Sequence, residues 1–228
     1  MNALLWDVDG TLLLNSPVAG RLYDRAVAEV TGVEPAGRRP NEHGKTDAQI
    51  ITERLEDLGL GADLLPAVRE RLDVLSASAY TGEAARRAAP GTAEAVAAVA
   101  AAGWRNGLLT GNSPARIRAK FASAGLDPDL FDEGLWFTGE STTVRADLAR
   151  RARAAVADGT LVILGDTPSD GAAAAAAGIP FIAVATGAFD EVSLRATGAA
   201  LVIPDLVTGL PDLLTALDAA GQPIRAAR

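Results

Sequence analysis

The stretch Leu4-Leu5-Trp6-Asp7-Val8-Asp9-Gly10-Thr11 begins as an apolar run and ends in two carboxylates two residues apart, followed by Gly and Thr. Residues i and i+2 of an extended chain point to the same side, so we expect Asp7 and Asp9 together at the tip of a buried strand. Neighbouring carboxylates repel each other unless a cation or a shared proton neutralises them. The stretch therefore predicts a metal or acid–base site, with a plain Asp-x-Asp-Gly turn as the structural alternative.

Two later apolar runs also end in polar residues. The run at 161–164 is followed by Gly165-Asp166-Thr167-Pro168-Ser169-Asp170, and the run at 107–109 by Thr110-Gly111-Asn112. Short runs rich in branched residues are typical of buried parallel strands. Ligands of open α/β sheets bind at the carboxyl ends of such strands. We therefore expect three polar strand ends to converge on one site.

The order of expected elements predicts an α/β fold with a doubly wound, mainly parallel sheet, because strands and helices alternate. Strands are expected at 3–6, 105–110, 161–164, 181–185 and 201–203. Helices are expected at 92–102, 114–124, 145–157 and 168–177. Residues 15–87 interrupt this alternation with helical stretches at 18–31, 46–58 and 63–80. We interpret 15–87 as a helical cap domain, and 1–14 with 88–228 as the core.

The motifs and their order resemble those of the haloacid dehalogenase superfamily of Mg²⁺-dependent phosphohydrolases. That family has Asp-x-Asp-Gly-Thr first, a strand ending in Ser or Thr second, a basic residue third and Gly-Asp-x-x-x-Asp last. Residues 7–11 match the first motif, Thr110 the second and 165–170 the last, across nearly the whole chain. The resemblance implies a haloacid dehalogenase-like core with an inserted α-helical cap.

The third motif departs from the family, in which the basic residue is usually a lysine. The chain contains only Lys45 and Lys120. Lys120 falls in a helix docked by Ile117 and Phe121, and we expect it on a solvated face. Arg145 precedes the helix that leads to the last motif, so we assign it the basic role, with a surface charge at a helix start as the alternative. An arginine stays charged and grips phosphate through two donors.

The resemblance also implies residue roles. Asp7 would be the nucleophile that carries an aspartyl-phosphate, and Asp9 would be the general acid and base. Mg²⁺ would be held by Asp7, the Asp9 backbone carbonyl and Asp166. Asp170 would orient these ligands or bound waters without contacting the ion itself. The expected phosphate-binding residues are Gly10, Thr11, Thr110, Gly111, Asn112 and Arg145. Asp170 and Thr167 also fit structural roles, as a first-turn acid and a helix cap.

The loop Gly44-Lys45-Thr46-Asp47 precedes a helix of the cap. Thr46 or Asp47 fits the N-cap of that helix. The alternative, taken from family members with a helical cap, is that Lys45 and Thr46 contact the substrate. His43 is the only histidine, and its polar surroundings favour a surface position.

Composition excludes several classes of chemistry. The 228 residues include no cysteine, which rules out disulfides and thiol nucleophiles, and the remaining metal ligands are carboxylates and carbonyls suited to Mg²⁺. A net charge of -8 argues against nucleic-acid binding by a broad basic surface. The apolar stretch 171–188 reads as a helix and a strand, not a membrane span. We expect no nucleic-acid or membrane partner, a cytoplasmic protein, and a monomer or homodimer.

The predicted function is hydrolysis of a small phosphorylated metabolite, with phosphoglycolate as one guess. A second acid at position 9 disfavours the dehalogenases and phosphonatases of the superfamily, which lack it. A sugar-phosphate mutase shares every core motif and remains the main alternative. The other alternative is a binding module with an inactive site.

Overall fold

The computed structural model describes residues 1–16, 18–36 and 42–221. Within them, six parallel strands form one sheet in the order β3-β2-β1-β4-β5-β6. The strands are β1 (Asn2–Trp6), β2 (Arg105–Thr110), β3 (Trp136–Thr138), β4 (Thr160–Gly165), β5 (Phe181–Val184) and β6 (Leu201–Ile203). The sheet confirms the predicted doubly wound α/β fold.

The central strand β1 is buried on both faces of the sheet. Leu4 and Trp6 belong to the hydrophobic cluster on one face, and Ala3 and Leu5 to the cluster on the other. This alternation follows from the period of two in an extended chain. The indole N–H of Trp6 donates to the Asn106 side chain at 3.0 Å, so its buried polar atom is satisfied.

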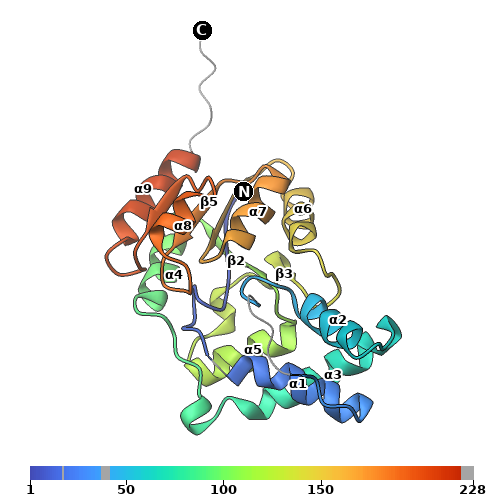
Figure 1. Cartoon of the computed structure of the whole chain (residues 1–228). Coiled ribbons are helices and arrows are strands. Elements are labelled where there is room, and N and C mark those ends of the chain that lie inside the picture. The colour runs from blue at the N-terminus through green and yellow to red at the C-terminus, as the bar shows by residue number, and fades with distance from the viewer. Residues whose placement is uncertain (17, 37–41, 222–228) are drawn as a thin grey trace.

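Helices cover both faces of the sheet, as Figure 1 shows. The cluster on one face includes residues of α4 (Thr92–Ala101), α5 (Pro114–Ala124) and α9 (Leu210–Gly221). The cluster on the other includes residues of α6 (Arg145–Ala155), α7 (Pro168–Ala177) and α8 (Glu191–Arg195). Many of these contacts are made by alanines of α6 and α7, whose small side chains permit close packing of the two helices.

The segment between β1 and α4 contains a helical unit, called here the helical insert: α1 (Val18–Thr31), α2 (Asp47–Asp57) and α3 (Leu65–Ala79). Its apolar side chains form a separate core, including Tyr23, Ile51 and Leu72. Figure 1 shows the three helices gathered beside α5 at one end of the sheet. The helices expected from the sequence in 15–87 are therefore present, while the division into two domains stays a prediction.

Three described elements were not expected from the sequence. Strand β3 has only three residues and follows two short 3-10 turns, at Pro128–Leu130 and Glu133–Leu135, so the apolar run Leu135-Trp136-Phe137 that marks it is short. Helices α8 and α9 are the other two. In the described part of the chain, no helix combines the length and hydrophobicity needed to cross a membrane.

Candidate active site

Three carboxylates from two strand ends meet at the carboxyl edge of the sheet. Asp7 follows β1, Asp166 follows β4, and Asp170 lies in the first turn of α7; each offers an oxygen within 4.8 Å of the others. Asp166 Oδ1 accepts from the Thr11 hydroxyl at 3.1 Å, while its buried Oδ2 has no hydrogen-bond partner among the described residues. A hard cation such as Mg²⁺ fits this donor set and would satisfy the unpartnered oxygen.

Two glycines allow the backbone to pass close to Asp166. A Cβ on Gly10, whose φ is +88°, would lie 2.2 Å from Asp166 Oδ2. A Cβ on Gly187 would lie 1.6 Å from the same oxygen. Gly10 and Thr11 were expected to bind phosphate, but Thr11 is fully buried and its hydroxyl holds Asp166. In this structure both residues support the carboxylate cluster.

Arg145 reaches the cluster from the first residue of α6. Its Nη2 lies 2.9 Å from Asp7 Oδ1 and also pairs with Asp170 Oδ1, and only 7% of the side chain is exposed. Its Nη1 donates to the Gly44 carbonyl at 3.2 Å. The structure thus brings Arg145 to the predicted nucleophile, which disfavours the surface-charge alternative. Its part in catalysis stays a prediction.

The electrostatics of the cluster are those of crowded buried acids. Burial, with the charges of Asp170 and Asp9, raises the pKa of Asp7 to about 6, although Arg145 acts in the opposite direction. Burial and the charge of Asp7 also raise the pKa of Asp166 well above its usual value. Burial alone would lower the pKa of Arg145, but the two carboxylates raise it above its usual value. A divalent cation would lower the acids' pKa values.

Asp170 and Thr167 form a capping box at the start of α7. Thr167 Oγ1 and its backbone N–H donate to Asp170 Oδ2 at 2.7 and 3.0 Å, and Thr167 Oγ1 accepts the Asp170 N–H at 3.3 Å. Both oxygens of Asp170 are therefore engaged by protein groups, one by Thr167 and one by Arg145. This arrangement agrees with a supporting role for Asp170 beside Asp7 and Asp166.

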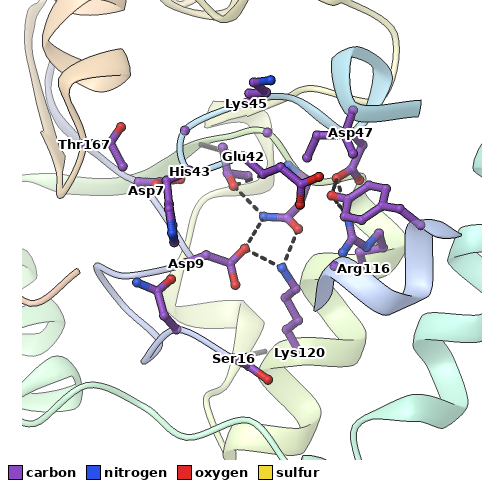
Figure 2. A pocket seen from close by; sticks show the side chains of 18 of the residues that line it. Asp7, Asp9, Ser16, Glu42, His43, Lys45, Asp47, Arg116, Lys120 and Thr167 are labelled. Atoms are coloured by element: carbon purple, nitrogen blue, oxygen red, sulfur yellow. Dashed lines mark hydrogen bonds and ion pairs between the residues drawn. The ribbon is translucent and has the colours of Figure 1, made fainter. Parts of the chain in front are cut away.

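Asp9 is not part of this cluster, and Figure 2 shows its carboxylate beside Lys120. Its Oδ1 accepts from Arg86 Nη2 at 2.6 Å, and its Oδ2 accepts from Asn112 Nδ2 at 2.9 Å and from Lys120 Nζ. The prediction of a solvated Lys120 was wrong, because the side chain is only 1% exposed. Partial burial would raise the pKa of Asp9, but Lys120 and Arg86 hold it well below its usual value.

The loop after β2 combines two roles. The Thr110 hydroxyl is buried and accepts from Asn112 Nδ2 at 2.8 Å, so Asn112 links Thr110 to Asp9. Gly111 lies directly under the loop that precedes α2, since a Cβ there would be 2.2 Å from the Lys45 carbonyl oxygen. The Asp47 N–H donates to the Gly111 carbonyl at 2.7 Å. The helical insert therefore contacts the predicted phosphate-binding loop through its backbone.

The residues of the loop that precedes α2 have different surroundings. Thr46 is the N-cap of α2: its fully buried hydroxyl accepts the Gln49 N–H at 3.1 Å and donates to the Thr142 carbonyl at 2.6 Å. Lys45 lines the pocket, but its Nζ is held by Glu53 at 2.6 Å. His43 is half-buried, lines the pocket and has its ring edge-on to that of Phe189.

A buried polar network joins the insert to the core. Arg116 of α5 pairs with Asp47 of α2, and both side chains are at most 2% exposed. Tyr23 of α1 donates to Asp47 Oδ1 at 2.6 Å, and its ring lies 4.7 Å from the Arg116 guanidinium carbon. The remaining oxygen of Asp47 accepts the Ser113 N–H at 2.9 Å.

One pocket collects these groups. Its walls come from the core and from the insert, and include Asp7, Asp9, Thr110, Gly111, Asn112, Lys120 and Arg145 on one side and Gly20, Tyr23, His43, Lys45, Asp47 and Ile50 on the other. In Figure 2, Lys45 lies at the top of the view, and Asp9 and Lys120 lie below it. The arrangement suits a small ligand with an anionic end at the core.

A model of the haloacid dehalogenase-like hydrolase family matches residues 1–178. The chain belongs to this family. A search of curated proteins returned no significant match.

Solved structures support the assignment of this haloacid dehalogenase-like hydrolase at the level of the fold. CbbY from Rhodobacter sphaeroides, in complex with phosphate, is 23% identical with a TM-score of 0.68, covering 92% of this chain and 99% of that one. A hydrolase from Pseudomonas syringae is 17% identical with a TM-score of 0.68, covering 97% and 100%. A family member from Deinococcus radiodurans, with bound phosphate and sodium, is 22% identical with a TM-score of 0.57, covering 99% of each chain.

Three cations of this hydrolase's pocket, Arg86, Arg116 and Lys120, were missed as site residues by the sequence analysis. Arg116 and Lys120 are four residues apart, which places both on one face of α5, and the helix begins just after Thr110. That spacing was the available signal. Arg86 gave none, because it lies outside every motif, just before the short backbone bridge between Leu13 and Ala88.

Proposed function

We propose that the protein is a Mg²⁺-dependent phosphatase that acts on a small phosphorylated metabolite through an aspartyl-phosphate. The observation that carries this proposal is the position of Asp7, which shares a buried carboxylate cluster with Asp166 while its Oδ1 faces Arg145. Family membership and the presence of phosphate in two similar structures also support it.

In the first step, an oxygen of Asp7 would attack phosphorus and the bond from phosphorus to the leaving oxygen would break. Arg145 and Thr110 line the same pocket, and the guanidinium and the hydroxyl would bind the non-bridging oxygens. Bound to Asp7, Asp166 and the Asp9 carbonyl, Mg²⁺ would offset the repulsion between carboxylate and phosphate.

Asp9 would give a proton to the leaving oxygen in this step. Lys120 and Arg86 keep Asp9 ionised when no substrate is bound. An arriving phosphate dianion repels the carboxylate and competes for Lys120 and Arg86. Both effects raise the proton affinity of Asp9, which would take up a proton from solvent before the transfer.

In the second step, water would attack the aspartyl-phosphate. Asp9 would take a proton from this water, the bond between phosphorus and Asp7 would break, and inorganic phosphate would leave. Because the helical insert supplies the opposite wall of the pocket, we propose that it is a cap domain of residues 15–87 that selects the substrate and excludes water.

The direct test is release of inorganic phosphate from a panel of phosphoglycolate, sugar phosphates and nucleotides, with Mg²⁺ and with chelator. We expect Mg²⁺-dependent release from at least one small ester, and its loss in Asp7→Asn. Transfer of phosphate between hydroxyls without release would favour the mutase, and binding without either reaction would favour the inactive module.

A further inference from the structure

The environment of Asp9 differs from that of the other site carboxylates. Three side-chain donors, from Arg86, Asn112 and Lys120, converge on its two oxygens, whereas Asp166 keeps an oxygen without a partner in the described structure. The side chains of Arg86 and Lys120 are 0% and 1% exposed, while that of Asp9 is 31% exposed. Two buried cations thus present one accessible carboxylate to the pocket.

Each cation is itself held by a separate part of the chain. Lys120 Nζ also donates to Asn112 Oδ1 at 2.6 Å, and Asn112 in turn donates to Thr110. Arg86 Nη2 also donates to the Leu14 carbonyl at 2.9 Å, and the Arg86 N–H donates to the Ser123 hydroxyl at 2.8 Å. Leu14 precedes the helical insert and Arg86 follows it, so Arg86 joins both connections of the insert to Asp9.

These contacts have a clear physical consequence for Asp9. Asp9 lies two residues from Asp7, and the two negative charges repel each other. A half-exposed aspartate without fixed donors would turn toward solvent, whereas acid–base catalysis needs its oxygen within hydrogen-bond reach of the leaving group. Lys120 and Arg86 oppose both tendencies, because they attract the carboxylate and are themselves fixed.

We propose that Lys120 and Arg86 are positioning residues that hold the Asp9 carboxylate on the leaving-group side of Asp7. The proposal rests on the proposed function, in which Asp9 protonates the leaving oxygen. Asn112 couples this position to Thr110, and Arg86 couples it to the two connections of the insert. Closure of the insert over a substrate would therefore act on Asp9 through Arg86.

The test compares two leaving groups. p-Nitrophenolate leaves without a proton, whereas an alkoxide requires one, so loss of Asp9 positioning harms the alkyl ester selectively. We expect Lys120→Met to lower kcat/KM for phosphoglycolate or glycerol 3-phosphate, whichever the wild type hydrolyses faster, by about 10-fold or more beyond its effect on p-nitrophenyl phosphate. Asp9→Asn should show the same bias more strongly, and Arg86→Met should share it.

The matched control is Arg118→Met, on the same helix but exposed and paired with Glu133. It should change both esters by less than about 2-fold, as expected for a surface pair. An equal fall for both esters in Lys120→Met would overturn the proposal, because a structural defect lowers both alike.

A crystal structure of Lys120→Met separates this proposal from the proposed function. We expect the Asp9 side chain to leave the position it shares with Arg86 and Asn112 and to turn toward solvent. An unchanged Asp9 would overturn the positioning role even if the enzyme is active. If the wild type releases no phosphate from any ester, the phosphatase fails while the displaced Asp9 still supports the positioning role.

Discussion

Arg116, on a helix that covers the sheet, forms an ion pair with Asp47 of the helical insert, and both side chains are almost completely buried. The pair is surrounded by further donors, since Arg116 also bonds Tyr23 and Ser76, and Asp47 also accepts from Ser113. It fastens α2 of the insert to α5 at the edge of the pocket. A change at this pair should therefore affect both the stability of the protein and the position of the helical insert.

Removing one partner of this pair should destabilise the whole protein. Asp47→Asn or Arg116→Met leaves a buried charge uncompensated, which costs about 3–5 kcal/mol. For a chain of this size that corresponds to a fall in Tm of about 10 °C. Thermal unfolding followed by circular dichroism measures it. Arg195→Met, which removes an exposed pair with Glu191, is the control and should change Tm by less than about 2 °C. A fall in Tm that is no larger for Asp47→Asn or Arg116→Met than for Arg195→Met would contradict a stabilising role of the buried pair.

Asp7→Asn should stabilise the metal-free protein at neutral pH. The pKa of Asp7 is raised to about 6 in the folded state, so the folded state binds more protons than the unfolded chain between pH 4 and 6. The free energy of unfolding contributed by Asp7 therefore falls as the pH rises through this interval. In chelator, the variant should have a Tm a few degrees above wild type at pH 7.5, with a smaller difference at pH 4.5. A wild type more stable than the variant at pH 7.5 would contradict this account of the cluster.

Gly187→Ala should weaken metal binding. The added Cβ would collide with Asp166 Oδ2 and push the carboxylate out of the cluster. We expect the Mg²⁺ concentration for half-maximal stabilisation in a thermal shift assay to rise at least about 10-fold, the size of effect typical of changes beside metal ligands. Gly134→Ala is the control, because its nearest contact would be 3.3 Å away. Unchanged Mg²⁺ dependence in Gly187→Ala would place the metal elsewhere.

Arg145→Lys should retain more activity than Arg145→Met. Both Asp7 and Asp170 use the Nη2 of Arg145, so a single ammonium group can replace much of this interaction. Loss of the charge should cost about 10²-fold or more in kcat, while the lysine variant should lose about 10-fold or less. Steady-state kinetics on the best ester of the panel decides between these values. Equal loss in both variants would show that the guanidinium shape, and not the charge, is required.

The sheet and the carboxylate cluster were predictable because their signals are local in sequence. Apolar runs that stop at Asp7, Thr110 and Asp166 mark both the strands and the residues at their ends. The edge strand β3 has only three residues and a correspondingly short apolar run, and it was missed. The donors around Asp9 were missed for another reason. Arg86 and Lys120 are separated from Asp9 by 77 and 111 residues in the sequence. Tertiary structure brings these residues together: β1 pairs with β2, which precedes the helix that carries Lys120, and Arg86 is tied to that helix through Ser123.

The most direct test of the central claim is to find the residue that carries phosphate. Wild-type protein would be mixed with its best substrate and Mg²⁺, quenched in acid within milliseconds, reduced with borohydride and mapped by mass spectrometry. Acid preserves an acyl-phosphate, and borohydride converts the modified aspartate to homoserine. The account predicts homoserine at position 7 in the wild type and none in Asp7→Asn. If the enzyme turns over but homoserine is found at another position, or at none, an aspartyl-phosphate at Asp7 is contradicted.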